Sequence, residues 1–176
     1  MKIFQGVRPL DYVLATVLSA AGVLLMLLNI IDGDDPSLVH PVSTTSWLIV
    51  PAFLLVTVPI LWRRRNVLAV VAVTVAATAA HVLAFGWLTR CGVVLPLSAA
   101  LAYAVARFSR TRRDHLLGLT GVLALQVIML TRDASAGLID ALPVAVVPAA
   151  LFYGIGLLVQ NRVSKRQSAA VQRVTV

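Results

Sequence analysis

Residues 12–31 read YVLATVLSAAGVLLMLLNII, a run of twenty residues without a charged side chain. A helix of about twenty apolar residues spans the hydrocarbon core of a bilayer, which is roughly 30 Å thick. The apolar part of a secretory signal peptide is shorter, about 7–15 residues. Lys2 and Arg8 supply a basic start, as in signal peptides, but the length of the run favours a membrane-spanning helix that is retained.

The rest of the chain has the same apolar character. Of its 176 residues, 60% are hydrophobic and 12% are charged, and the mean hydropathy is +0.93. Soluble domains average about 45–50% apolar and about 25% charged residues. The net charge is +8, but the basic residues form short clusters between long apolar runs, which is typical of the loops of membrane proteins. The composition therefore predicts a lipid bilayer as the surroundings and no nucleic-acid partner.

The apolar runs predict an all-α polytopic membrane helix bundle of about six spans. One bundle domain is expected at residues 1–160, followed by a short basic cytoplasmic tail at residues 161–176. The fifth span has only sixteen residues, so it must be tilted little or be helped by its neighbours. The alternative is four clear spans with a short helical hairpin at 93–131. The six expected spans are 9–31, 44–62, 67–88, 93–108, 116–131 and 138–159.

Several prolines fall inside these spans. Pro51 and Pro59 lie in the second, Pro96 in the fourth, and Pro143 and Pro148 in the sixth. Each removes a helix hydrogen bond and favours a kink. Because Pro143 and Pro148 are close together, we expect the outer half of the sixth helix to be irregular.

The basic residues predict the orientation of the bundle. With the amino terminus inside, 13 of the 15 cations fall on the inner side, and only Arg90 and Arg132 fall outside. This asymmetry predicts that both termini are cytoplasmic. We interpret the central arginine clusters as topology determinants that contact anionic lipid headgroups. Those arginines are Arg63, Arg64, Arg65, Arg107, Arg110, Arg112 and Arg113.

The sequence lacks the motifs of common catalytic sites. It contains no GxSxG, HExxH, GxxxxGK[ST] or GxGxxG pattern, and all seven acidic residues are aspartates. Cys91 is the only cysteine and is expected to be a small packing residue at a span boundary. The aspartates of residues 32–35 lack the spacing of a calcium loop. We therefore predict no enzymatic activity, no cofactor and no metal site.

His81 is an ionisable residue inside the third span, toward its outer half. Such residues usually face the bundle interior and are candidates for a functional role. The alternative is a neutral histidine that is hydrogen-bonded to a neighbouring helix, for which Gln126 of the fifth span is the suggested partner. We favour this alternative, and we keep both residues as candidates for ligand binding.

Charged residues also gather at the outer mouths of spans three, five and six. Arg90, Arg132, Asp133 and Asp140 are candidates for binding a charged external ligand. The competing interpretation is that they are interfacial side chains that pair loosely.

The last residues are polar and basic. Val163, Ala170 and Val174 fit apolar heptad positions, with Gln167 at the remaining one. This pattern is consistent with the start of a coiled coil that continues the sixth helix, and equally with a frayed tail.

Several stretches share a layout with a known family. Residues 8–11 (RPLD) precede the first span, and residues 58–66 (VPILWRRRN) place a proline and three arginines between spans two and three. Residues 101–107 (LAYAVAR) lead into the second basic loop, and the sixth span continues into the basic segment 162–166. With its alanine-rich third span that holds His81, the chain resembles the amino-terminal membrane domain of actinobacterial two-component sensor histidine kinases. The resemblance implies a sensory input domain whose last helix is a signalling helix.

The chain departs from that family in the kinase part. The resemblance implies a phospho-accepting histidine followed by Asp and then an ATP-binding domain. None of His40, His81 and His115 is followed by Asp, and the chain ends at Val176. We therefore expect no autophosphorylation, and either a free-standing relative of the input domain or a truncated form.

Three functional hypotheses follow. The leading one is a non-enzymatic sensory or accessory subunit that packs against a partner, as a homodimer or with a histidine kinase or transporter subunit. The second is a small transporter or channel subunit with His81, Gln126 and Arg132 along its path. The third is a structural assembly subunit of a larger membrane complex.

Overall fold

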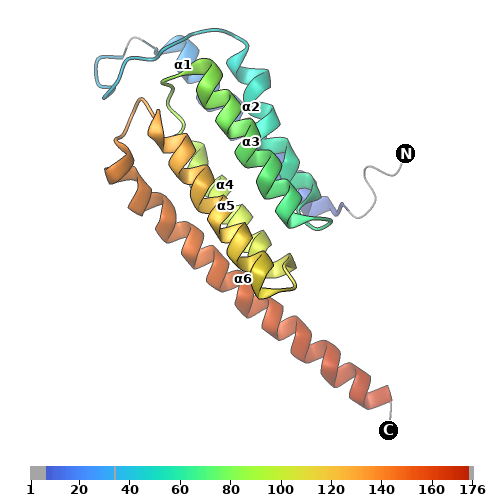
Figure 1. Cartoon of the computed structure of the whole chain (residues 1–176). Coiled ribbons are helices and arrows are strands. Elements are labelled where there is room, and N and C mark those ends of the chain that lie inside the picture. Colours follow the sequence, from blue (N-terminus) through green and yellow to red (C-terminus); the bar gives the residue numbers. More distant parts are fainter. Residues whose placement is uncertain (1–6, 34, 175–176) are drawn as a thin grey trace.

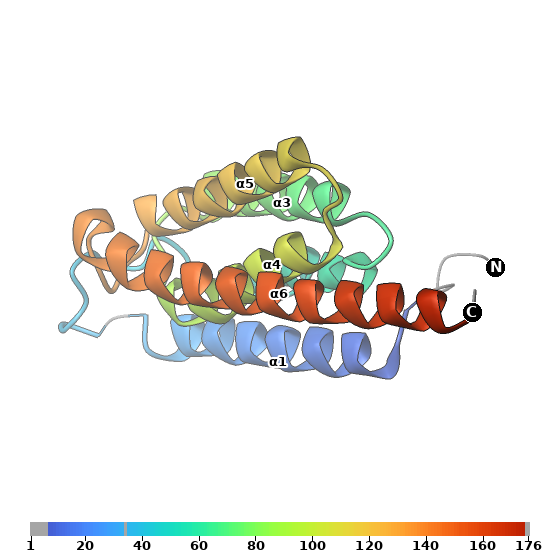
Figure 2. The ribbon, with the colours of Figure 1, turned by 90° about the horizontal axis from the view of Figure 1, so that it is seen from below.

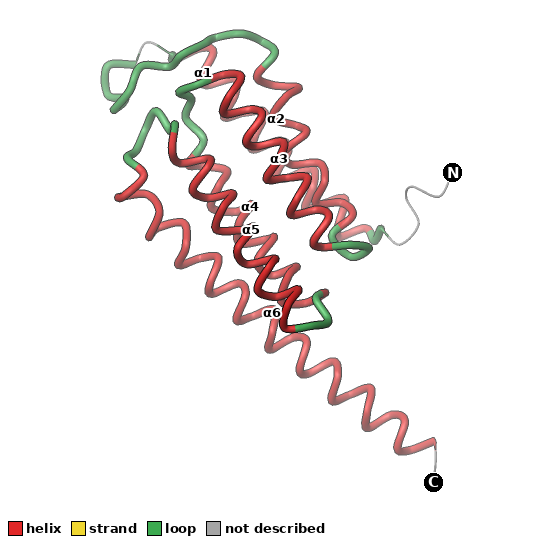
Figure 3. The backbone as a smooth tube through the Cα atoms, in the orientation of Figure 1, coloured by secondary structure: helices red, strands yellow, loops and turns green. Residues whose placement is uncertain are grey.

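The computed structural model describes residues 7–33 and 35–174, with side chains described up to residue 166. This part of the chain is helical and has no strand beyond a single isolated bridge (Figures 1 and 3). The elements are α1 (Pro9–Ile31), α2 (Ile49–Thr57), the 3-10 helix η1 (Val58–Trp62), α3 (Val67–Phe85), α4 (Cys91–Phe108), α5 (Arg112–Thr131) and α6 (Leu138–Val174).

Five of the described helices are long and apolar enough to cross a membrane. They are α1, α3, α4, α5 and the Leu138–Arg166 part of α6. The helix that falls short is Ile49–Trp62, which combines α2 and η1. The structure therefore supports a multi-pass membrane protein, and the exact number of spans and their orientation stay predictions.

The expectation that the fifth span is the short one was wrong. Helix α5 has 20 residues because it begins at Arg112, four residues earlier than expected. Thr111 caps its start: the Thr111 hydroxyl accepts from Asp114 N, and the Asp114 carboxylate accepts from Thr111 N. This capping box lets the helix begin inside the charged loop. The charged residues there have low hydropathy, so the apolar pattern did not include them in the predicted span. The alternative of a short hairpin at 93–131 also fails, since α4 and α5 are both full-length helices.

The prolines act differently from one helix to the next. At Pro59 the second segment changes from α to 3-10 geometry, in agreement with the expected break. Helix α6, in contrast, is continuous through Pro143 and Pro148, so the expected irregularity was wrong. The Gln126 side chain donates a hydrogen bond of 2.8 Å to the carbonyl of Ala145, three residues before Pro148. This bond gives a hydrogen-bond donor to a carbonyl in the turn where Pro148 lacks a backbone N–H and weakens the helical hydrogen bonding.

The helices form two groups, one of α1, α2 and α3 and one of α4, α5 and α6. Helix α4 also contacts α1 and α3 of the first group. Helices α1, α2 and α3 pack together, and α4 packs most extensively against α6. Helices α3 and α5 lie side by side and join the two groups (Figure 2). Small residues allow α5 and α6 to lie close to α4: a methyl group added at Gly118 would lie 2.7 Å from the Val105 side chain. One added at Gly156 would lie 2.6 Å from Ala106 Cβ.

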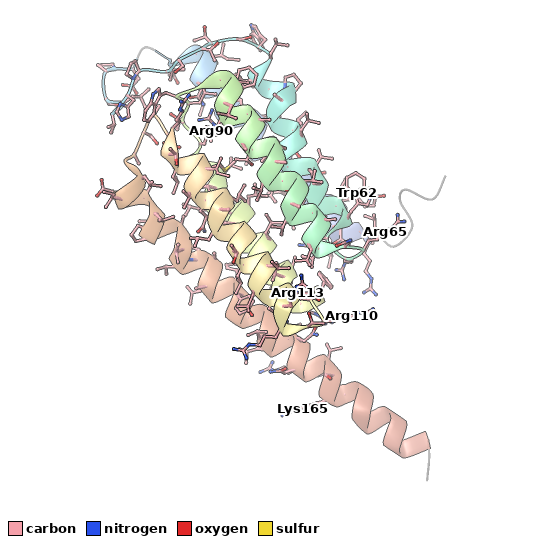
Figure 4. All side chains as sticks on the ribbon, viewed as in Figure 1. Trp62, Arg65, Arg90, Arg110, Arg113 and Lys165 are labelled. Carbon is pink, nitrogen blue, oxygen red and sulfur yellow. The ribbon has the colours of Figure 1, made fainter. Side chains whose placement is uncertain are left out.

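The two ends of the bundle differ in their chemistry. We call the end formed by residues 32–33, 35–48, 86–90 and 132–137 the loop end. The opposite end, at residues 63–66 and 109–111, is called the basic end. Arg90 lies at the loop end, whereas Arg65, Arg110 and Arg113 lie at the basic end (Figure 4).

Helix α6 extends past the basic end of the bundle (Figure 1). Its backbone is helical to Val174, which agrees with a continuation of the sixth helix. The expected tail at 161–176 is thus largely part of α6. The heptad positions Gln167, Ala170 and Val174 have side chains outside the described residues.

Candidate functional site

Arg90 is the centre of a buried polar cluster at the loop end. It precedes the first residue of α4, and none of its surface is exposed. Its Nη1 donates to the Arg132 carbonyl at 2.8 Å, and its Nη2 donates to the Gly86 carbonyl at 3.0 Å. Its Nε donates to His81 Nδ1 at 3.4 Å. One guanidinium therefore ties the link between α3 and α4 to the end of α5.

Asp133 holds the backbone of the same link. Its buried carboxylate accepts from the main-chain N of Arg90 at 2.7 Å through Oδ2. Through Oδ1 it accepts from the N and the Oγ of Ser135, at 2.9 and 2.6 Å. An isolated parallel bridge between Leu88 and Asp133 strengthens the connection, with Ala134 N donating to the Leu88 carbonyl at 3.2 Å. The loops between α3 and α4 and between α5 and α6 thus form one unit.

His81 joins this unit to α2. It is buried on α3, and its Nε2 lies 3.3 Å from the Ile49 carbonyl. Because its Nδ1 accepts from Arg90, the proton is on Nε2, which donates to Ile49. The rings of Phe53 and Phe85 pack around it, at centroid distances of 5.2 and 4.9 Å. A hydrogen-bonded histidine was expected, but the suggested partner Gln126 was wrong.

The five candidate ligand residues are not all in one place. His81, Arg90 and Asp133 meet at the loop end, and Arg132 contributes its carbonyl while its side chain is exposed. Gln126 is buried elsewhere, between α5 and α6. Ligand binding by this set stays a prediction.

Burial lowers the pKa of the Arg90 guanidinium to about 10, with the Asp133 charge raising it and the Arg132 charge lowering it further. At neutral pH the group is therefore still charged. Its N–H donors point at carbonyls and at His81, so this cation is used to hold the loops together.

Asn29 is a further member that sequence analysis missed. Its Oδ1 accepts from Thr89 N at 2.7 Å, and its Nδ2 donates to the Thr89 carbonyl at 3.0 Å. These two bonds tie α1 to the link that carries Arg90. An asparagine near the end of an apolar run was the available signal, because a polar amide in a membrane helix needs a partner.

A mostly apolar cavity of about 270 Å³ lies beside the cluster. Its lining includes Cys91 at the start of α4, Leu130 on α5, and Asp140 and Val144 on α6. Cys91 Sγ lies 3.1 Å from Ser135 Oγ, so the cysteine packs at the helix boundary as expected. Within the described ranges, no group of three or more His, Cys, Asp or Glu side chains is placed to hold a metal ion.

The basic end contains a second cluster, which centres on Asp11 of α1. This carboxylate is buried and pairs with Arg63, whose Nη2 lies 2.8 Å from Oδ1. It also pairs with Arg64, whose Nε lies 2.7 Å from Oδ2. The main-chain N of Arg8 donates to the same carboxylate at 3.0 Å. Asp11 belongs to the RPLD stretch before the first span, and no sequence pattern indicated its pairing with the arginines.

The Asp11 cluster continues to α6. The Arg64 guanidinium lies 5.2 Å from the centre of the Phe108 ring, and that of Arg107 lies 5.9 Å from it. Arg107 Nη1 donates to Gln160 Oε1 at 2.7 Å. Charged and aromatic contacts therefore connect the start of α1 with the part of α6 that leaves the bundle.

The arginines expected to act as topology determinants have different surroundings. Arg63 is largely buried against Asp11, and Arg64 and Arg107 make the contacts described above. Four are exposed at the basic end, and their contact with lipid headgroups stays a prediction. They are Arg65, Arg110, Arg112 and Arg113.

Comparison with protein-family models, curated proteins and solved structures gives no match for this chain.

Proposed function

We propose that this chain is a non-enzymatic sensory or accessory membrane subunit that acts through helix packing against a protein partner. The observation that carries the proposal is helix α6, which is continuous over 37 residues from the loop end to a point beyond the basic end. A continuous helix transmits a shift at one end to the other, because its hydrogen-bonded backbone resists bending.

The contacts at the loop end suggest where a signal enters. Asp133 and Ser135 lie just before α6 and are bonded to each other, and Asp133 also accepts from the main-chain N of Arg90. A ligand or partner that displaces this unit moves the start of α6. The apolar cavity beside it, lined by Cys91 and Asp140, is the candidate entry point.

The contacts at the basic end suggest where the signal leaves. Gln160 of α6 is bonded to Arg107, which shares the Phe108 ring with Arg64. A shift of α6 therefore changes the contacts of α1 and α4 at this end. A partner helix packed beside α6 has direct access to that change.

The resemblance to histidine-kinase input domains supports this assignment. In such a protein the last membrane helix continues into the signalling helix, and α6 has that position. We propose the plasma membrane of a bacterium as the location, with both termini in the cytoplasm. The partner is then a second copy, a histidine kinase or a transporter subunit.

The transporter alternative has less support. Two of the three residues on its proposed path are already bonded within the bundle: Gln126 donates to the Ala145 carbonyl, and His81 contacts Arg90 and the Ile49 carbonyl. They are therefore occupied in holding the bundle together. The assembly-subunit alternative differs from the proposal in one respect, since it requires no movement of α6.

Two measurements test the proposal. The first is mild-detergent affinity purification from native membranes with quantitative mass spectrometry, which should find a stoichiometric membrane partner or a homodimer. The second is the distance between spin labels at positions 65 and 162, which should change in His81→Ala. Leu83→Ala, at an exposed position two residues away on α3, is the matched control. The proposal is contradicted if the protein purifies as a monomer without partners and the 65–162 distance does not change in His81→Ala. Movement of a solute across liposomes that contain the protein would support the transporter alternative.

A further inference from the structure

A polar pocket lies at the basic end, between the start of α3 and the loop that joins α4 to α5. Its volume is about 260 Å³, and unlike the cavity at the loop end it is lined largely by polar groups. The lining includes Arg64, Arg65 and Asn66 on one side and Ser109, Arg110 and Asp114 on the other. Two segments that are more than forty residues apart in the chain therefore bring three guanidinium groups to one pocket.

Ser109 is the unusual member of this lining. Its main-chain N donates to the Val105 carbonyl, but its buried Oγ has no hydrogen-bond partner among the described residues. Only 4% of the residue is exposed. A buried hydroxyl without a partner is unfavourable by about 1–3 kcal/mol, and a hydrogen-bonding ligand in the adjoining pocket would offset this cost.

The charges around Ser109 define the kind of ligand. In the described part of the chain both ion pairs go to Asp11, so Arg65 and Arg110 have no carboxylate partner. Asp114 is the one acidic group in the lining, and its Oδ2 already accepts from Thr111 N. Arg65 and Arg110 therefore leave the pocket positively charged, while Arg64 is already paired with Asp11.

The start of α3 adds backbone donors. Asn66 caps this helix, its side chain accepting from Ala69 N, while Val67 and Leu68 of the first turn line the pocket. The first N–H groups of a helix have no partner within it, and its dipole favours an anion there. Hydroxyl, guanidinium and helix-start donors together are the usual donor set for phosphate.

We propose that this pocket binds a phosphate group, with Ser109, Arg65 and Arg110 as its side-chain donors. At the level of the basic loops, that phosphate has two possible sources: the headgroup of an anionic lipid or a soluble phosphate compound. The inference does not depend on the proposed sensory function. It assigns the two exposed arginines a specific ligand in addition to general attraction to the membrane surface.

The test compares four forms of the full chain: wild type, Ser109→Ala, Arg110→Gln and the control Arg113→Gln. Arg113 is exposed on the same end of the bundle but does not line the pocket. Ser109→Ala removes an unpaired buried hydroxyl, so its stability without ligand should equal or exceed that of wild type. This property separates a lost binding site from a misfolded protein.

Two binding assays distinguish the sources. In the first, thermal unfolding in detergent is followed with inorganic phosphate or with sodium chloride at equal ionic strength. In the second, native mass spectrometry counts lipids retained from phosphatidylcholine nanodiscs with and without phosphatidic acid. Ser109→Ala and Arg110→Gln should each weaken binding at least about tenfold, while Arg113→Gln should change it less than about twofold.

The outcomes separate clearly. Stabilisation by inorganic phosphate with this variant pattern supports the pocket and a soluble source. Retention of phosphatidic acid alone, with the same pattern, supports the pocket and a lipid source. If neither probe binds, or if Arg113→Gln weakens binding as much as Arg110→Gln, the proposal is wrong and the arginines act only through general electrostatics.

Discussion

Arg63 and Asp11 are 52 residues apart in the chain, yet Nη2 of the arginine lies 2.8 Å from Oδ1 of the aspartate. The Arg63 Nε donates to the same oxygen at 2.9 Å. This two-point pair connects the first helix to the turn that follows η1. It also shows that part of the arginine cluster at the basic end holds the helices together, in addition to any role in orientation.

Asp11→Asn should lower the free energy of unfolding by about 2 kcal/mol. The carboxylate is fully buried and accepts from Arg8, Arg63 and Arg64, so the amide leaves two guanidinium groups poorly paired. Unfolding in mixed detergent micelles measures the effect. Asp140→Asn, at an exposed position of α6, is the control and should be near neutral. Equal losses in the two variants contradict the importance of the Asp11 cluster.

Arg90→Lys should destabilise the loop end by about 3 kcal/mol. Lysine keeps the charge but cannot reach the carbonyls of Gly86 and Arg132 together, because it lacks the planar fork of the guanidinium. The matched control is Arg132→Lys at an exposed side chain, with a change within about 0.5 kcal/mol. Hydrogen exchange at residues 86–90 and 132–135 should rise only in the first variant. Unchanged exchange there means that Arg90 does not hold these loops.

Gly156→Ala should separate α4 from α6, whereas Gly154→Ala should not. A methyl group at position 156 meets Ala106 Cβ at 2.6 Å and the Tyr103 carbonyl at 2.9 Å, while position 154 has nothing within 4 Å. We expect a loss of about 2 kcal/mol for the first variant, since well-packed interfaces do not accept added volume. The second should gain up to about 1 kcal/mol from the higher helix propensity of alanine. Thermal unfolding in detergent compares them, and the reverse order contradicts the α4–α6 packing.

The predicted orientation can be tested by cysteine accessibility in a Cys91→Ala background. Both test positions are exposed: Asp35 at the loop end and Arg110 at the basic end. A membrane-impermeant thiol reagent should label Asp35→Cys in intact cells and Arg110→Cys only after the cells are opened. If only Arg110→Cys is labelled in intact cells, the orientation is the reverse of the predicted one. If both positions are labelled in intact cells, the number of spans differs from the predicted six.

The local composition predicted the helices well where the bilayer imposes their length. The start and end of α1 and the start of α3 agree with the expected spans. Asn66 ends the basic turn and caps α3 through its own side chain, which is a local signal. Helix boundaries that fall among charged residues were predicted less accurately, as at Arg112. An apolar pattern ends at the first charged residue, whereas a capped helix continues through it.

The candidate site was predicted only in part. His81, Arg90 and Asp133 were recognised as ionisable groups near the outer boundary, and the structure brings them together. Their actual partners are the carbonyls of Ile49, Gly86 and Arg132. Every residue has a backbone carbonyl, so the amino-acid sequence does not indicate which carbonyls a buried cation will contact.

By itself, the sequence determined that this is an α-helical membrane protein with its cations gathered at alternate loops, because apolar run length and charge are local properties. The tertiary structure alone decided the pairing of Asp11 with Arg63, the continuity of α6 through two prolines and the pocket at Ser109. Each of these depends on which helix lies beside which. That arrangement follows from the packing of small residues such as Gly156 against α4, and from hydrogen bonds between segments distant in the chain.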